Sequence, residues 1–74
     1  GLIAITGEGR LFSAGIDLEE VAKAGSPDEA SRPFRGLAEA IDSILSCHKA
    51  VATILNGPAV AGGAELALSS DILI

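Results

Sequence analysis

Residues 50–71 read AVATILNGPAVAGGAELALSSD. The first part of this stretch, Ala50–Leu55, is an apolar run with β-branched residues, which is typical of a buried strand. Turn-forming residues follow at positions 56–58, and the glycine-rich segment Ala59–Gly63 then leads into Ala64–Ser70, where we expect a helix. The stretch therefore predicts a strand, a glycine-rich turn and a helix in that order.

Two further strand-like runs flank this stretch. Gly1–Thr6 is apolar and β-branched, as expected for a strand that is buried on both faces, and Asp71–Ile74 begins a similar run. Strands that are separated by helices pair in parallel, so we predict an α/β fold with a parallel sheet. No loop precedes the first outer run, and no turn or cap follows the second. We therefore expect residues 1–74 to be part of a single longer domain, truncated at both ends.

A short helix is predicted after the first loop. Asp17 is a candidate N-cap for a helix that continues to Ala24. Glu20 stands three residues later, at the spacing of a capping box, and Gly25 is a plausible C′ residue.

A longer helix is predicted to follow at once. Ser26 is its candidate N-cap, with Pro27 at N1 and Glu29 at N3. Apolar residues recur at helical spacing at Phe34, Leu37, Ala38, Ile41, Ile44 and Leu45. Pro33 lies within this pattern and lacks a backbone donor, so we expect a kink or a restart near residues 31 and 32.

Composition excludes several classes of protein. A chain of 74 residues forms one domain at most and buries only roughly 60% of its unfolded surface. The apolar share of 49% argues against disorder, and the single Cys47 argues against a disulfide scaffold. The longest uncharged run, Ala50–Ala64, is too short for a membrane span. Because the net charge is −5, nucleic acid is not an expected partner, and we expect a soluble protein of the reducing cytoplasm.

The sequence does not match the common nucleotide-binding and hydrolase motifs, because one required residue of each motif is missing. Phe12 stands where a dinucleotide fingerprint needs its third glycine, and Gly63 stands where a P-loop needs lysine. Leu11 replaces the first glycine of a nucleophile elbow. Cys47 and His48 are adjacent and therefore point in different directions, so we interpret them as packing and capping residues at a helix end.

Two glycine-containing turns remain, Phe12–Asp17 and Val60–Glu65, each after a predicted parallel strand. Open α/β sheets bind ligands at this end of their strands. Glycine lets a substrate approach the main chain closely, and N–H groups from two turns can converge on one oxygen. We therefore predict an oxyanion hole, to which the N-terminus of the second turn's helix adds partial positive charge.

The motifs FSAGIDL at 12–18 and NGPAVAGGAELALSSD at 56–71 together closely resemble the enoyl-CoA hydratase/isomerase, or crotonase, family. The resemblance covers nearly the whole chain and implies a crotonase-like spiral of β-β-α units. It also implies syn addition of water to a 2-enoyl-CoA by a trimeric or hexameric enzyme. Coenzyme A would arrive as part of the substrate, with no metal and no other cofactor. An isomerase or another acyl-CoA lyase of the family is the alternative, and a non-catalytic fragment is the alternative from a different class.

The resemblance also assigns individual residues. The family's two main-chain N–H donors fall on Ile16 and Gly62, and its first catalytic glutamate falls on Glu65. Without the motif, Glu65 would be interpreted as an acid that complements the helix dipole. The family's second catalytic carboxylate lies beyond Ile74.

Further residues are assigned to the binding of substrate or coenzyme A: Arg10, Ala14, Gly15, Asp17 and Gly63. Arg10 is the candidate for the phosphates, because Glu19 occupies a position that is lysine in some hydratases. Asp17 is also explained as a helix cap. Ala61 replaces a glycine of many family members, a replacement that is tolerable if this position keeps an ordinary helical or extended φ.

Overall fold

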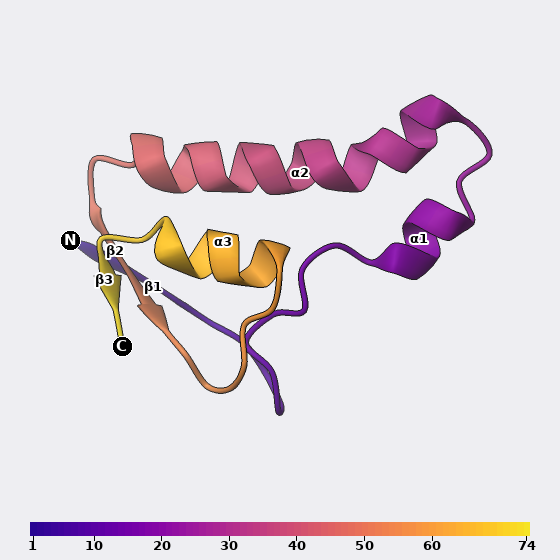
Figure 1. Cartoon of the computed structure of the whole chain (residues 1–74). Helices are drawn as coiled ribbons and strands as arrows, with labels where there is room; N and C mark the ends of the chain where they lie inside the picture. Colours follow the sequence, from indigo (N-terminus) through magenta and orange to yellow (C-terminus); the bar gives the residue numbers. More distant parts are fainter.

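The computed structural model describes residues 1–74 and contains three strands and three helices in the order β1-α1-α2-β2-α3-β3. The strands are β1 (Leu2–Thr6), β2 (Ala50–Ile54) and β3 (Ile72–Leu73). They form one parallel sheet with the order β1-β2-β3 (Figure 1). The predicted α/β class and the parallel pairing are therefore confirmed, whereas the spiral of β-β-α units stays a prediction.

The core lies around β2, the central strand of the sheet. Val51, Ala52 and Thr53 are buried, and they belong to a set of only seven buried residues in the chain. The outer strand β1 was expected to be buried on both faces, but Leu2 is 62% exposed and Ile3 is 40% exposed. That expectation is wrong within residues 1–74, because four of the five residues of β1 are exposed and only Ile5 is half-buried.

Helix α1 spans Leu18–Ala22, and Asp17 is its N-cap as predicted. The Asp17 carboxylate accepts hydrogen bonds from the N–H groups of residues 19 and 20 at 2.9 and 3.4 Å. The predicted end is wrong, because the helix stops at Ala22 and Lys23 is the C-cap. Lys23 has an ordinary right-handed φ of −87°, so Gly25 is not needed as a left-handed C′ residue.

Helix α2 spans Pro27–Ser46, and Ser26 is its N-cap, with the Ser26 hydroxyl accepting the Glu29 N–H at 3.2 Å. Of the kink or restart predicted near residues 31 and 32, the restart is wrong, because α2 includes Pro33 and is one continuous helix (Figure 1). The kink stays a prediction. A proline removes only one main-chain hydrogen bond, here to the carbonyl of Glu29, and side-chain contacts support the same turns.

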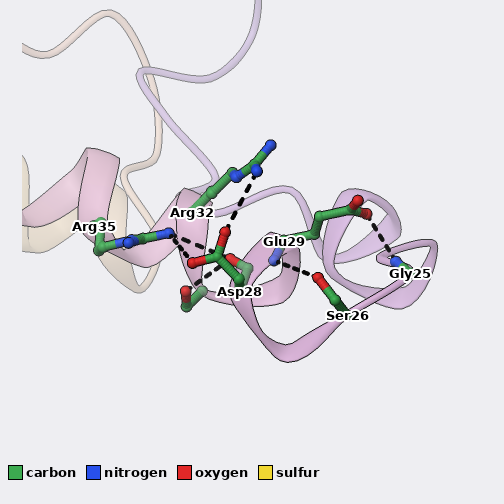
Figure 2. A network of polar contacts seen from close by, with 7 residues as sticks. Gly25, Ser26, Asp28, Glu29, Arg32 and Arg35 are labelled. Carbon is green, nitrogen blue, oxygen red and sulfur yellow. Dashed lines mark hydrogen bonds and ion pairs between the residues drawn. The ribbon is translucent and has the colours of Figure 1, made fainter.

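These contacts centre on Asp28 (Figure 2). Its carboxylate pairs with Arg32 at 3.4 Å and with Arg35 at 3.0 Å. The Glu29 carboxylate accepts the N–H of Gly25 at 2.8 Å, which ties α2 to the connection from α1. The start of α2 is thus stabilised by local polar contacts rather than by burial.

The other end of α2 leads directly into β2. Cys47 is the C-cap, and its N–H donates to the carbonyl of Ile44 at 3.3 Å, which confirms the predicted capping role. His48 is exposed and makes no hydrogen bond with its side chain. None of the helices combines the length and apolarity that a crossing of a bilayer requires.

Helix α3 spans Gly62–Leu68, so it begins two residues before the predicted start at Ala64. It contacts α2, and its buried residues are Gly62, Gly63 and Ala67. The two glycines at its start belong to the second predicted turn. The fold therefore places the beginning of α3 directly after the loop that leaves β2.

Candidate active site

The two turns predicted from the sequence lie side by side. Phe12 donates its N–H to the carbonyl of Pro58 at 3.0 Å, and Val60 donates its N–H to the carbonyl of Ser13 at 2.9 Å. Ser13 and Ala59 form an isolated parallel bridge between these bonds. The pairing of β1 with β2 is therefore resumed beyond the ends of the strands, where the two loops approach each other (Figure 1).

Gly15 brings the two backbones into contact. Its φ is +89°, a region that residues with a Cβ rarely adopt. A Cβ at this position would lie 2.9 Å from the nitrogen of Gly62 and 3.2 Å from the carbonyl oxygen of Val60. Glycine is required here for its backbone conformation and for the close approach of the second turn.

The N–H groups of Ile16 and Gly62 donate no hydrogen bond within the chain, and the same holds for those of Ser13, Ala14, Asp17 and Ala61 in these turns. The nitrogen of Ile16 lies 3.8 Å from the position that a Cβ on Gly62 would occupy. The next three N–H groups of α3 are all paired, with the carbonyls of Val60 and Ala61. The start of α3 thus offers one free donor, and that donor lies beside the free N–H of Ile16 in the first turn.

The turn that presents Gly62 is strained at Ala61. Ala61 has φ +50° and ψ −118°, and it is the only residue other than glycine with a positive φ. The Gly63 N–H donates to the Val60 carbonyl at 2.9 Å, which closes a type II′ turn over residues 60–63. The condition under which alanine would be tolerated here, an ordinary φ, is not met, because this turn type needs a positive φ at its second residue.

Gly63 has a packing role. It is buried, and a Cβ there would meet the carbonyl oxygen of Ser13 and lie 2.7 Å from the Ser13 Cβ. Its N–H is already used by the turn. The second glycine of α3 therefore allows the helix to begin directly against the first turn.

Glu65 lies in the first turn of α3 and is exposed. It lines a groove of about 470 Å³ between α2 and α3, whose other lining residues are Phe34, Leu37, Ala38, Ile41, Asp42 and Leu45. The Glu65 carboxylate makes neither an ion pair nor a hydrogen bond, since both ion pairs of the chain involve Asp28. A free carboxylate beside an apolar groove is chemically able to accept a proton from a molecule that binds there.

The other predicted binding residues occupy the first loop and its turn. Arg10 is exposed and makes no ion pair, and Ala14 is exposed at the turn. The Gly15 N–H donates to the Ser13 hydroxyl at 3.1 Å, which orders the turn locally. Asp17 caps α1, which confirms the structural interpretation of that residue. The structure thus brings Gly15, Ile16, Gly62 and Gly63 together, with Glu65 further along α3.

Sequence reasoning missed one residue of this region, Asn56. It was interpreted as part of a turn and of the second family motif, but its side chain makes three hydrogen bonds to the loop that follows β1. The pattern Asn-Gly after a strand predicts a turn and does not reveal a contact with a distant loop. No group of three or more His, Cys, Asp or Glu side chains is placed to hold a metal ion.

Comparisons with known proteins bear on the same residues. A family model described as enoyl-CoA hydratase/isomerase matches residues 1–74. The 4-chlorobenzoyl coenzyme A dehalogenase-1 of Arthrobacter sp is 40% identical over 78 residues, which cover 100% of this chain and 28% of the relative. A putative enoyl-CoA hydratase of Thermus thermophilus is 39% identical over 75 residues, covering 97% of this chain and 29% of the relative.

A third relative, the carnitinyl-CoA dehydratase of Escherichia coli K12, is 42% identical over 73 residues. That match covers 95% of this chain and 26% of the relative. The chain thus spans less than a third of the length of the curated relatives that it matches. No solved structure matches the chain significantly.

Proposed function

Because this chain belongs to the enoyl-CoA hydratase/isomerase family, we propose that it forms the thioester-binding part of an enoyl-CoA hydratase. The enzyme would be a longer protein that contains this chain, hereafter the full-length protein. The observation that carries the proposal is the pair of free N–H groups at Ile16 and Gly62, in two turns whose backbones touch at Gly15.

In the proposed reaction these two N–H groups donate hydrogen bonds to the thioester oxygen of a 2-enoyl-CoA. Water adds to the β-carbon, and negative charge develops on the thioester oxygen as the enolate forms. Donors that are already fixed in position stabilise this charge without having to reorganise. The position of Gly62 at the start of α3 adds the favourable end of the helix dipole.

Glu65 is the proposed general base. Its carboxylate would take a proton from the attacking water, while a second carboxylate outside residues 1–74 would complete the proton transfers to the α-carbon. The structure supports this role because Glu65 is unpaired and lines the groove that begins beside Gly62. The Leu37 side chain links the two, since its Cδ2 lies 2.7 Å from the position of a Cβ on Gly62.

The names of the relatives support a CoA thioester as the substrate more strongly than they support hydration as the reaction. They describe a dehalogenase, a hydratase and a dehydratase, and each name contains coenzyme A or CoA. An isomerase or another acyl-CoA lyase would use the same hole with a different acid or base. The residue at the second carboxylate position in the full-length protein distinguishes these reactions from hydration.

We also propose that coenzyme A enters only as part of the substrate. Arg10 is the candidate for contact with its phosphates, because it is exposed, unpaired and close in sequence to the first turn. Ala14 would contact the substrate at the exposed surface of that turn. Assembly into trimers or hexamers and a cytoplasmic location belong to the same proposal.

The substitution Glu65→Gln in the full-length protein tests the function. Glutamine keeps the shape of the side chain but cannot accept the proton, so turnover of a short 2-enoyl-CoA should fall by roughly 100-fold to 10,000-fold. Affinity for the acyl-CoA should change little. The rate of hydration and the melting temperature are measured together.

The matched control is Glu39→Gln, because Glu39 is exposed on α2 and its side chain makes no contact with the groove. This variant should keep the parental rate. If Glu65 only complements the helix dipole, Glu65→Gln will lose about 0.3–1 kcal/mol of stability and keep nearly normal turnover. That result would contradict the proposed base.

A further inference from the structure

Asn56 follows β2, outside the residues proposed to touch the substrate. Its side chain reaches across to the loop that follows β1. The Oδ1 atom accepts the N–H of Gly7 at 3.0 Å, and Nδ2 donates to the carbonyls of Gly9 and Leu11, each at 3.1 Å. One amide side chain therefore uses its acceptor and both of its donors on a single loop.

This loop leads directly into the first turn. Residues 7–11 are bound through Asn56, and the next residue, Phe12, begins the backbone bonds that join the two turns. All side-chain hydrogen bonds between residues 7–11 and the segment after β2 come from Asn56. The position of the first turn relative to the second thus depends on this side chain and on the main-chain pairing beyond it.

The surrounding glycines show how closely the loop fits. A Cβ on Gly7 would lie 2.6 Å from the carbonyl oxygen of Phe12 and 2.9 Å from Oδ1 of Asn56. A Cβ on Gly57 would collide with the carbonyl oxygen of Arg10. The loop therefore lies against residues 56 and 57 with no space for side chains at these contacts.

We infer that Asn56 is a positioning residue for the oxyanion hole. By holding residues 7–11 it sets the place of the first turn, and so it sets the separation between the Ile16 and Gly62 N–H groups. Asparagine fits these contacts because its side chain offers one acceptor and two donors at this distance from the backbone. Aspartate lacks the donors, and the side chain of glutamine is longer. The inference rests on the proposed function, because the hole is part of that function.

The first test compares Asn56→Ala with Thr6→Val in the full-length protein. Thr6 also bridges the two segments, because its hydroxyl donates to the carbonyl of Ile54 at 2.9 Å, but it does not touch the loop. A small misplacement of catalytic groups costs about 100-fold in rate, so Asn56→Ala should lower kcat for a short 2-enoyl-CoA by about that factor. KM should change little, since the loss falls on the transition state. Thr6→Val should keep the parental kcat.

The substitution Asn56→Asp tests the two donor contacts of the side chain separately from its acceptor contact. Aspartate keeps the contact with the Gly7 N–H but places negative oxygen against the carbonyls of Gly9 and Leu11. Its kcat should therefore be as low as that of Asn56→Ala. A kcat close to the parental value in Asn56→Asp would overturn the inference.

Hydrogen exchange of the backbone provides a readout that does not depend on turnover. In Asn56→Ala the amides of residues 7–16 should exchange faster than in Thr6→Val, while those of α2 stay unchanged. Unchanged exchange over residues 7–16, or an equal loss of kcat in Thr6→Val, would overturn the positioning role. A parental protein that acts on no acyl-CoA would instead overturn the proposed function, and the exchange comparison would still decide whether Asn56 holds the loop.

Discussion

The paired turns (residues 7–16 and 56–63) and the helical arm (residues 17–46) are held in place by different kinds of contact. In the paired turns, the Asn56 side chain joins residues that are 45 to 49 positions apart in sequence. In the helical arm, every side-chain hydrogen bond joins residues seven positions apart or fewer. Neither helix of the arm contains a buried residue.

The glycines show the same contrast. Gly15 has a positive φ and no space for a Cβ, whereas Gly36 lies within α2 and has nothing within 4 Å of a Cβ position. The geometry of the paired turns depends on close contact between distant segments. The arm depends on local helix formation, so substitutions should be far more costly in the turns than in the arm.

The largest effect is expected from Gly15→Ala, with Gly36→Ala as its control. The positive φ alone costs on the order of 1–3 kcal/mol for a residue with a Cβ. The added methyl group would also push Gly62 away from Ile16, so turnover should fall by about 100-fold. Gly36→Ala should instead raise the free energy of unfolding by about 0.5–1 kcal/mol, since alanine favours the helix.

Urea denaturation and the rate of hydration in the full-length protein measure both variants. Equal stability losses at the two glycines would remove the contrast between the turns and the arm. Normal turnover in Gly15→Ala would show that the contact between the turns is not needed for the hole.

The same contrast explains what could be predicted from the sequence. The caps at Asp17 and Ser26 were predicted correctly, because a cap is a contact between a side chain and a backbone group two or three residues away. The early end of α1 was missed, since the spacing of polar and apolar residues sets helix boundaries only loosely.

Contacts between distant segments could not be predicted in this way. The positive φ of Ala61 follows from the type II′ turn against Gly15, and the bonds of Asn56 need the loop after β1 as their partner. The assignment of Ile16 and Gly62 came from the resemblance to a family. The structure adds that both of these N–H groups are free and that their turns are in contact.

A smaller effect is expected from Ala61→Gly. Glycine adopts the φ of +50° without strain, so this variant should be more stable by about 1 kcal/mol, after the cost of a more flexible unfolded chain. Turnover should stay close to normal because the turn is kept. Ala61→Val should be destabilised, since a β-branched residue rarely adopts a positive φ.

Urea denaturation of the two Ala61 variants in the full-length protein decides the matter. A loss of stability in Ala61→Gly would mean that Ala61 is not strained. The turns would then differ less from the arm than the backbone conformation indicates.

The smallest effect is expected from Asp28→Asn in the helical arm. Asp28 pairs with Arg32 and Arg35, but the side chains are 63%, 65% and 56% exposed, so water screens both ion pairs. The loss of stability should be about 0.5 kcal/mol at low ionic strength and should nearly vanish at about 1 M salt. Turnover should not change.

Steric effects at Gly15 and Ala61 do not depend on salt, so urea denaturation at low and high salt separates the two regions. If the loss in Asp28→Asn exceeded that in Gly15→Ala, or persisted at high salt, the polar contacts at the start of α2 would be as important to the fold as the contact between the turns.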